Sequence, residues 1–265
     1  MSQSGQPRIG ESREVVPADE VTWDVETDVV VAGAGGTGLV AAVAACENPD
    51  LTVTILEKAP EPGGNTALST GMVPAAGTDQ QRAVGIEDTP EDMAADILEK
   101  NGHQADEEMV RHLCRESRNL VHWLVDDWDV TLELVDDFRY PKHSEYRMHA
   151  PAGRNGANLV AELVERIEAT PNVELLTNAP VNRLVAEDGA IVGVVAGDPV
   201  EEAIRARKVI LATDGFGGNR RMVRQYCDET IEEALYFGSD GNTGDGIRFG
   251  AELGGALACM DAYQG

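Results

Sequence analysis

The sequence predicts an α/β fold with a mainly parallel sheet, and three observations carry this prediction. Residues 28–32 form a short β-branched apolar run, typical of a buried parallel strand, that leads directly into a glycine-rich turn and a helical stretch. A second strand pattern at 51–56 completes a strand–helix–strand unit, and further strand patterns follow at 173–176 and 209–212. The 265 residues and 42% hydrophobic content are enough for such a core.

The turn after the first strand reads Gly33-Ala34-Gly35-Gly36-Thr37-Gly38. Its spaced glycines have separate roles, because Gly33 permits the tight turn, Gly35 lets the backbone approach a pyrophosphate, and Gly38 lets the helix pack on the strand. The helix, expected from about Gly36 to Cys46, directs its N-terminal amides at ligand phosphates. Glu57 ends the second strand, about 20 residues past the glycines, where a dinucleotide site needs an acceptor for ribose hydroxyls.

Glycine turns also serve plain β-to-α connections, and a lone turn of this kind would leave that alternative open. Here strand, turn, helix, second strand and terminal acid occur in the right order. The combination predicts a Rossmann-like domain that binds a dinucleotide.

The stretch from Glu57-Lys58 to Gly63-Gly64-Asn65-Thr66 resembles the flavoprotein subunits of fumarate reductase and succinate dehydrogenase. Soluble relatives of that family include urocanate reductases and 3-ketosteroid Δ1-dehydrogenases. In the family, an Asp-Val-Val-Val-x-Gly-x-Gly strand, an Ile-Leu-Glu-Lys strand end and a Gly-Gly-Asn/Ser/Thr loop hold FAD, so the resemblance implies FAD as the cofactor. Adjacent glycines let the backbone pass close to the flavin end, and Asn65, Thr66 and Ser69 offer hydrogen bonds there.

Residues 67–78 resemble the family's Ser-x-Gly-Gly-Met segment beneath the flavin, with Gly71 and Met72 matching and Thr70 standing where many relatives have glycine. Membrane-bound members attach FAD through a histidine in this loop. Because no histidine occurs between Glu57 and Gly102, the resemblance implies non-covalent FAD.

Two later segments also resemble the family. The run Ala212-Thr213-Asp214-Gly215 resembles the return to the FAD site with Asp214 replacing a glycine; its carboxylate could repel the pyrophosphate or turn outward. The run Thr243-Gly244-Asp245-Gly246 opens a helix in the family and contributes its aspartate to FAD, while backbone at the position of Val181 receives the adenine. The predicted cofactor contacts are Gly33, Ala34, Gly35, Gly36, Thr37, Gly38, Glu57, Lys58, Gly63, Gly64, Asn65, Thr66, Ser69, Gly71, Met72, Val181, Ala212, Thr213, Gly215 and Asp245.

A helical insertion at about residues 88–150 is predicted from apolar spacing that places helices at 90–101 and 106–126, with Trp123 and Trp128 as core or domain-contact residues. A strand at 130–135 leads into a polar loop at 136–156. Its weak catalytic candidates are His143, His149 and Tyr146, with Arg139 and Arg147 of the right type to meet an anionic substrate. Mixed polar loops are usually only solvated, so the catalytic residues stay unassigned.

After the insertion, a helix is predicted at 157–169 and a β-hairpin or meander at 181–186 and 191–195, with its turn at Asp188-Gly189. Residues 1–22 are expected to form a disordered acidic tail, and 23–265 the FAD-binding domain. In the family, a segment like Asp261–Gln264 precedes a substrate-binding His-Pro-Thr and later a capping domain. Since neither follows here, we expect the capping domain to be absent.

Two functions are therefore consistent with the sequence. The first is an oxidoreductase, or its FAD-binding half, that transfers hydride between flavin and an activated carbon–carbon bond of a small molecule such as fumarate, urocanate or a steroid. The second is a non-catalytic truncated or split-gene fragment that needs a second chain for activity. In either case apolar surface around the flavin predicts association with a second polypeptide or with itself.

The charge excludes other classes of partner. Forty-seven acids against 21 bases give a formal charge of −26, which opposes binding to nucleic acid and to anionic lipid. The lysine-poor surface is similar to that of halophilic proteins, although a merely acidic protein is the alternative. No metal-ligand spacing occurs among Cys46, Cys114, Cys227 and Cys259, so no metal is predicted. Without a signal segment or an apolar membrane span, we expect a cytoplasmic protein with reduced thiols.

Overall fold

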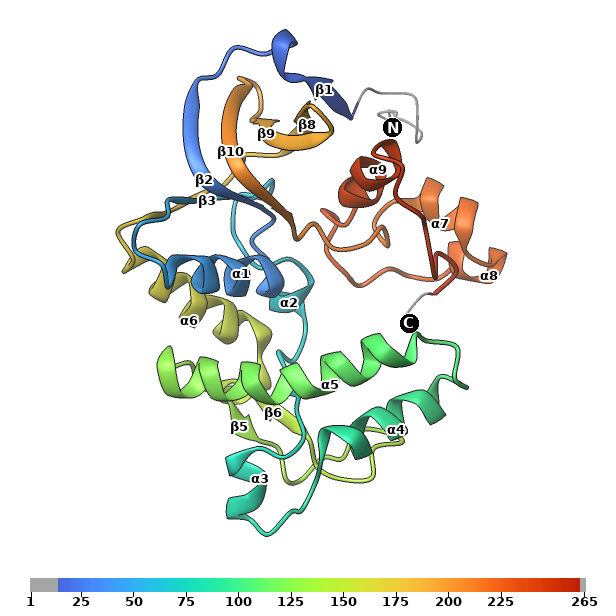
Figure 1. Cartoon of the computed structure of the whole chain (residues 1–265). Helices are drawn as coiled ribbons and strands as arrows, with labels where there is room; N and C mark the ends of the chain where they lie inside the picture. The colour runs from blue at the N-terminus through green and yellow to red at the C-terminus, as the bar shows by residue number, and fades with distance from the viewer. Residues whose placement is uncertain (1–13, 263–265) are drawn as a thin grey trace. The chain divides into compact units, whose positions relative to one another are not determined.

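The computed structural model describes residues 14–262, and the chain divides into two compact units. Residues up to 65 and from 164 onward form one, here called the sheet unit, and residues 66–163 form the other, the inserted unit. Figure 1 labels most of the helices and strands of both. Each unit is described by itself.

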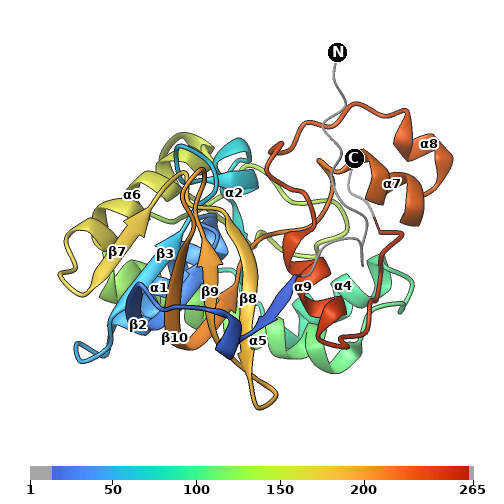
Figure 2. The same cartoon turned by 90° about the horizontal axis from the view of Figure 1, so that it is seen from above.

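The sheet unit is built on a seven-stranded sheet with the order β1-β8-β9-β10-β2-β3-β7. Strands β10, β2, β3 and β7 are mutually parallel, β1 is parallel to β8, and β9 is antiparallel to both of its neighbours, which confirms the mainly parallel α/β prediction (Figure 2). The strands are β1 (Val15–Pro17), β2 (Val25–Ala32), β3 (Val53–Leu56), β7 (Val173–Leu176), β8 (Val181–Glu187), β9 (Ala190–Ala196) and β10 (Glu202–Leu211).

Burial explains why the central strands read as continuous apolar runs. The last four residues of β2 and all four of β3 are buried, as expected for parallel strands covered on both faces. Helix α1 (Gly36–Cys46) contacts β2, β3 and β10, and its buried residues include Leu39, Ala42 and Val43. Its bounds are those predicted from the sequence.

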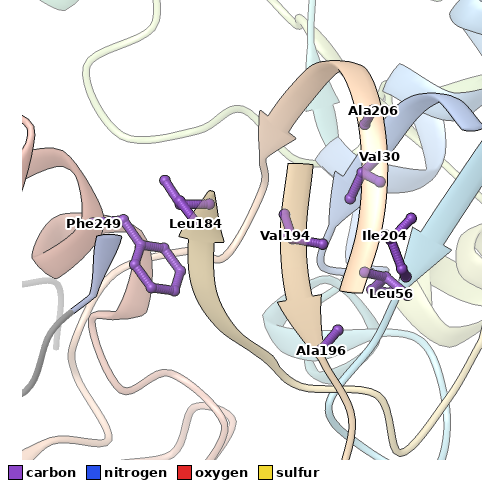
Figure 3. Close-up of a cluster of buried hydrophobic side chains, with 8 residues drawn as sticks. All are labelled: Val30, Leu56, Leu184, Val194, Ala196, Ile204, Ala206 and Phe249. Atoms are coloured by element: carbon purple, nitrogen blue, oxygen red, sulfur yellow. The ribbon is translucent and has the colours of Figure 1, made fainter. Parts of the chain in front are cut away.

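The core of the sheet unit also fixes helix α9 (Asp245–Glu252). Phe249 of α9 is 1% exposed and belongs to the same buried cluster as Val30, Leu56 and Leu184. Figure 3 shows its ring beside Leu184 of β8. Burying a phenylalanine of this kind contributes about 1.5–3 kcal/mol, so α9 has a defined position on the sheet. The other C-terminal helices of this unit are α7 (Arg220–Tyr226) and α8 (Glu229–Glu232).

Residues 14–22 differ from the predicted tail. They form β1 and a 3-10 turn at Ala18–Glu20, with Val15 opposite Leu184 and the 9%-exposed Val16 packed among buried residues of β8, β9 and β10. A three-residue strand has too short a pattern to be recognised, because its stability comes from pairing with β8 rather than from its own propensity. The rest of that prediction, residues 1–13, lies outside the described residues.

The structure extends one other strand prediction and agrees with the predicted hairpin turn. The strand predicted from residue 209 is the end of β10, which begins at Glu202 and alternates between buried Ala206 and exposed Arg205 and Arg207. The β8–β9 hairpin turns at Asp188 and Gly189 as predicted, and both have positive φ (50° and 79°), as a type I′ turn requires.

The inserted unit combines a small antiparallel sheet, in the order β4-β6-β5, with helices. Thr89 and Asp106 cap the two long helices by accepting from backbone amides of the first turn, which fixes where each helix begins. The strand predicted at 130–135 is ordered as a strand only at Glu133–Leu134. The elements are α2 (Gly64–Leu68, which starts in the sheet unit), β4 (Val73–Pro74), α3 (Asp79–Ala83), α4 (Pro90–Lys100), α5 (Glu107–His122), a π-helical turn (Trp123–Asp127), β5 (Glu133–Leu134), β6 (Met148–Ala150), a 3-10 turn (Ala152–Arg154) and α6 (Gly156–Glu168, which ends in the sheet unit).

Across residues 14–262, no helix has both the length and the apolar character needed to cross a bilayer.

Candidate functional site

Two glycines of the turn after β2 are required by the fold itself. Gly33 has a φ of +106°, and a Cβ there would lie 2.4 Å from the carbonyl oxygen of Ala212. A Cβ on Gly38 would lie 1.9 Å from the carbonyl oxygen of Gly33, so only glycine lets α1 start this close to the strand end. These are the turn and packing roles expected from the spacing.

Gly35 is different, because no close contact within residues 14–262 requires a glycine at this position. Its backbone is in an ordinary extended conformation, with φ −77° and ψ 180°, and a Cβ there would come no closer than 3.8 Å to the Gly63 carbonyl oxygen. Gly35 is also the N-cap of α1 and provides no side-chain oxygen to the first turn of the helix. A missing Cβ at a helix N-terminus leaves room for a phosphate to approach the backbone.

The second glycine loop lies against the first. Gly35 and Gly63 form an isolated parallel bridge, and the Gly63 amide donates to the Ala34 carbonyl over 2.9 Å. A Cβ on Gly64 would have the Gly35 Cα, at 3.9 Å, as its nearest neighbour. The two loops predicted from separate motifs therefore form one glycine-lined surface.

Glu57 is buried, at 8% exposure, and its carboxylate holds the end of β3 against the turn. One oxygen accepts from the Ala34 amide and the other from the Ala59 amide, each over 2.8 Å. A carboxylate has about four lone-pair sites, so these two bonds leave acceptor capacity for ribose hydroxyls. The acid lies beside the glycine turn, as the spacing predicts.

A cavity of about 540 Å³ lies entirely within the sheet unit, and the two residues that follow Glu57 in the chain line it. It brings together three predicted residues, Lys58, Val181 and Asp245, from segments far apart in the sequence. Seven lining residues were not predicted: Ala59, Pro180, Asn182, Asp240, Gly241, Thr243 and Arg248. Thr243 was detectable from its place in the Asn-Thr-Gly-Asp-Gly run, and Arg248 from lying one helical turn after Asp245.

Lys58 and Asp245 form an ion pair at this cavity. The Lys58 ammonium donates to Asp245 over 2.6 Å and to the Thr243 hydroxyl over 2.8 Å. Burial raises the pKa of the Asp245 carboxyl, but the positive charge of Lys58 and the hydrogen bonds from Lys58 and Thr243 outweigh it, so the pKa is lower than usual. An ammonium has three donors, and the third N–H of the 30%-exposed Lys58 is available to a ligand.

The return segment after β10 places Asp214 in a defined pose. Its carboxylate accepts from the Asn65 amide over 2.7 Å and from the Gly215 amide over 2.9 Å, so both oxygens have donors. Asp214 has a φ of +60°, a left-handed conformation that aspartate tolerates, and therefore it can replace the glycine of the family pattern without excessive strain. Thr213 accepts from the Gly246 amide, which joins this segment to the start of α9.

Asn242 is a candidate ligand contact that sequence reasoning missed. It is 7% exposed, its amide nitrogen donates to the Tyr236 hydroxyl, and within residues 14–262 its oxygen Oδ1 has no donor. A Cβ on Gly215 would have this oxygen, 4.0 Å away, as its nearest neighbour. A buried acceptor without a donor, facing a glycine, fits a ligand hydroxyl, and only the tertiary structure reveals it.

Four of the predicted cofactor contacts lie in the inserted unit, namely Thr66, Ser69, Gly71 and Met72. They hydrogen-bond to one another or pack against other residues of that unit. The Ser69 hydroxyl donates to the Thr66 carbonyl and accepts from the Gly71 amide. Gly71 has a φ of +67° and packs against Gly156, and Met72 packs beside Met148 and Ala150. Their part in cofactor binding stays a prediction.

The loop residues considered for catalysis have structural partners. His149 is fully buried, with one ring nitrogen 3.0 Å from the Thr78 hydroxyl and the other 2.9 Å from the Arg147 carbonyl. Burial lowers the pKa of His149 and so disfavours the protonated ring. Arg147 is fully buried between Asp88 and Asp96, so its guanidinium is occupied by protein carboxylates.

The other loop candidates are partly exposed. His143 stacks at a tilt on Tyr140, with ring centroids 5.3 Å apart, and burial lowers its pKa as well. Tyr146 is half-buried, and its carbonyl accepts from Gln81. Arg139 donates to the Ser144 carbonyl within the loop.

Comparison with known proteins fits this geometry. The family model described as FAD binding domain matches residues 28–264, nearly the whole described chain. The chain belongs to this family. The resemblance seen in the sequence is thereby confirmed, and the cofactor of the domain is FAD.

Named relatives agree with the family. The urocanate reductase of Eggerthella lenta is 33% identical over 253 residues, covering 94% of this chain and 41% of the relative. Among solved structures, the open conformation of a flavocytochrome c3 fumarate reductase matches with a TM-score of 0.81 at 30% identity, over 89% of this chain and 42% of the other. The 3-ketosteroid-Δ4-(5α)-dehydrogenase of Rhodococcus jostii RHA1 matches with a TM-score of 0.81 at 31% identity, over 93% and 58%. The chain thus spans roughly two fifths to three fifths of these relatives.

Proposed function

We propose that this chain is the FAD-binding part of an oxidoreductase that moves hydride between flavin and an activated carbon–carbon bond of a small molecule. The observation that supports this proposal is the glycine-lined surface next to the buried Glu57, where no described residue comes closer than 3.8 Å to the place of a Cβ on Gly35. Bound FAD would supply the hydride chemistry. The residues of this chain bind and orient it.

The binding roles follow from the placement of each group. The Gly35 backbone and the N-terminus of α1 favour the pyrophosphate, and the remaining lone pairs of Glu57 suit ribose hydroxyls. The cavity is lined by Lys58, the residue after Glu57, and by Val181, and it is of a size to take the adenine end. Asn242 offers an acceptor to a further hydroxyl of the ligand.

The attachment is non-covalent in this proposal. Covalent tethering in the family uses a histidine in the loop after the Gly-Gly-Asn motif, and no histidine occurs between Glu57 and Gly102. Acid precipitation of the FAD-loaded protein should therefore release the flavin to the supernatant.

The substrate belongs to the class that the named relatives indicate, namely a urocanate-, fumarate- or enone-like activated alkene. The proton donor is not assigned: His149 and Arg147 are fully buried, and His143 and Tyr146 are the two of the three catalytic candidates that are partly exposed. The alternative is a non-catalytic fragment that binds FAD and needs a second chain, a cap supplied in trans or another copy, to be active. We further propose a cytoplasmic protein adapted to high salt, supported by its charge of −26.

Gly35→Ala tests the proposal directly. The new Cβ has room in the protein and a permitted backbone conformation, so the free protein should fold with an unchanged melting temperature. Its affinity for FAD should fall by about tenfold or more, equivalent to about 1.4 kcal/mol, because the methyl group occupies the pyrophosphate space. Flavin fluorescence quenching on titration measures the affinity.

Gly250→Ala is the matched control. Gly250 lies in α9, where a Cβ would meet no atom within 4 Å, so the substitution should leave FAD binding unchanged. Equal FAD affinity in Gly35→Ala and the unmodified chain would overturn the assigned site.

A further inference from the structure

The start of β1 is fastened to α9 by a carboxylate that bonds to the backbone. Glu252, in the last turn of α9, accepts from the amide of Glu14 over 2.7 Å and from the amide of Val15 over 3.1 Å. Hydrogen bonds from backbone amides to an ionised carboxylate are stronger than neutral ones. The first residues of β1 are thus held by α9 as well as by their pairing with β8.

Arg248 continues this contact toward the cavity. Its Nε donates to the carboxylate of Glu14 over 3.0 Å, and a second guanidinium nitrogen lies 3.0 Å from the Asp245 carboxylate. Glu14 is 4% exposed, and Arg248 and Asp245 both line the cavity. The planar guanidinium can bridge two acids at once, which a lysine ammonium does with less geometric control.

The resulting order of charges is Glu14, Arg248, Asp245, Lys58, alternating in sign from β1 to the cavity. Asp245 accepts from Arg248 and Thr243 on one oxygen and from Lys58 on the other, so protein donors already occupy most of its lone pairs. Within residues 14–262, the Lys58 ammonium uses two of its three N–H donors and keeps the third for a ligand in the cavity. Asp245 therefore serves the ligand mainly through Lys58.

We propose that Glu14, Glu252 and Arg248 are positioning residues for the adenine end of the FAD site. They fix Asp245, and through it the Lys58 ammonium, toward the cavity, and the proposal rests on the function proposed above. Because coupling is reciprocal, a ligand in the cavity must also stabilise the attachment of β1. A segment outside the family match, which begins at residue 28, thereby takes part in cofactor affinity.

The experiment compares charge-neutral variants by isothermal titration with two probes, FAD and ADP, on the full chain. Arg248→Gln should weaken the binding of both about tenfold, and Glu14→Gln and Glu252→Gln should weaken it about fivefold, within the usual range of coupling between sites. Arg207→Gln is the matched control, since Arg207 pairs with Asp28 on the same sheet, is 76% exposed, and does not line the cavity. It should bind both probes like the unmodified chain.

A double-mutant cycle separates positioning from plain stabilisation. If Glu14 acts through Lys58, then Glu14→Gln should have no further effect on ADP affinity in a Lys58→Met background. Amide exchange of Val15 and Val16 should also slow when ADP binds. If the role is purely structural, the variants should melt at a lower temperature but bind ADP with unchanged affinity. The effects of Glu14→Gln and Lys58→Met on ADP affinity would then be additive. That result would overturn the inference.

The outcomes also distinguish this inference from the proposed function. Normal FAD and ADP binding by Glu14→Gln and Glu252→Gln would remove the positioning role and leave the FAD site in place. No binding of either probe by the unmodified chain would remove both. Should Arg248→Gln not fold, Glu252→Gln decides the question, because it leaves every cavity-lining side chain unchanged.

Discussion

Each unit of the molecule contains a cation held by acids, and the two sites differ in what else they can do. In the inserted unit, Arg147 and Asp88 have side chains that are 0% and 1% exposed, and the guanidinium bonds to Asp88, Asp96 and Ser144. In the sheet unit, Lys58 and Asp245 are 30% and 18% exposed and border a cavity.

The difference shows that charge type alone does not identify a binding site. A sealed cation with its donors satisfied contributes to specificity of folding, and its removal leaves acids buried without a partner. A cation at a cavity with a donor to spare can contribute to a ligand at a small cost in stability. The Arg147 site and the Lys58 site each contain a basic residue in a polar stretch of sequence. The sequence alone therefore cannot distinguish the structural site from the binding site.

The largest effect on stability should come from removing the buried cation Arg147. Arg147→Met leaves Asp88 and Asp96 without their cation, and we expect a loss of about 3–5 kcal/mol in the free energy of unfolding. Urea denaturation followed by circular dichroism measures it.

The control for this change is Arg111→Met in the same unit. Arg111 pairs with Glu107 on the surface of α5, with side chains 41% and 61% exposed, so its loss should cost no more than about 0.5 kcal/mol. Similar stabilities for the two variants would show that the Arg147 site is not the sealed structural element described.

At the cavity of the sheet unit, Lys58→Met should lower the affinity for FAD more than it lowers the stability of the fold. The partial exposure of the pair limits the change in unfolding free energy to about 1 kcal/mol. The affinity for FAD should fall about tenfold, or about 1.4 kcal/mol, because a charge-assisted donor to the ligand is lost.

Lys208→Met, at an exposed position of β10, supplies the control for Lys58 and should bind FAD normally. A Lys58→Met protein that unfolds as readily as Arg147→Met but still binds FAD tightly would reverse the assignment of the two sites.

The sequence predicted the local part of the site and missed the long-range part. Gly33, Gly35, Gly38 and Glu57 could be placed because strand, turn and helix are consecutive, and a spacing translates directly into geometry. The pairing of Lys58 with Asp245 joins residues 187 positions apart, and no local pattern encodes it.

Two further features were hidden for the same reason. β1 is too short to give a pattern, and its existence depends on β8 and on Glu252, near the other end of the chain. The unsatisfied oxygen of Asn242 is visible only once its neighbours are known. His149 is the opposite case. Its residue type made it a catalytic candidate, but it is buried against Thr78 and belongs to the core.

His149 also gives a pH prediction for the sealed interior. Its folded pKa lies below the usual value near 6.5, chiefly through burial, so the unfolded chain binds more protons than the folded chain as the pH falls past that value. Stability should be fully present above about pH 7 and decrease with acidification, with a slope of at most about 1.4 kcal/mol per pH unit for this group.

Urea denaturation of the unmodified chain and of His149→Gln between pH 7.5 and 5.5 checks this sign. The difference in unfolding free energy between the unmodified chain and His149→Gln should become smaller as the pH falls. A difference that widens on acidification would mean that the folded protein holds His149 protonated, contrary to its buried, neutral environment.

Salt should have the smallest effect on stability per contact. It should act on the exposed acidic surface and not on the buried Arg147 site. Raising potassium chloride from 0.1 to 1 M shortens the screening distance from about 10 Å to about 3 Å, which relieves repulsion among the surface acids of a chain with charge −26. The melting temperature should therefore rise with salt to beyond 1 M. The Arg147–Asp88 contact lies out of reach of mobile ions, so the destabilisation caused by Arg147→Met should be the same at both salt concentrations. A flat melting profile would remove the proposed adaptation to high salt, and a salt-dependent Arg147→Met effect would show that ions reach that interior.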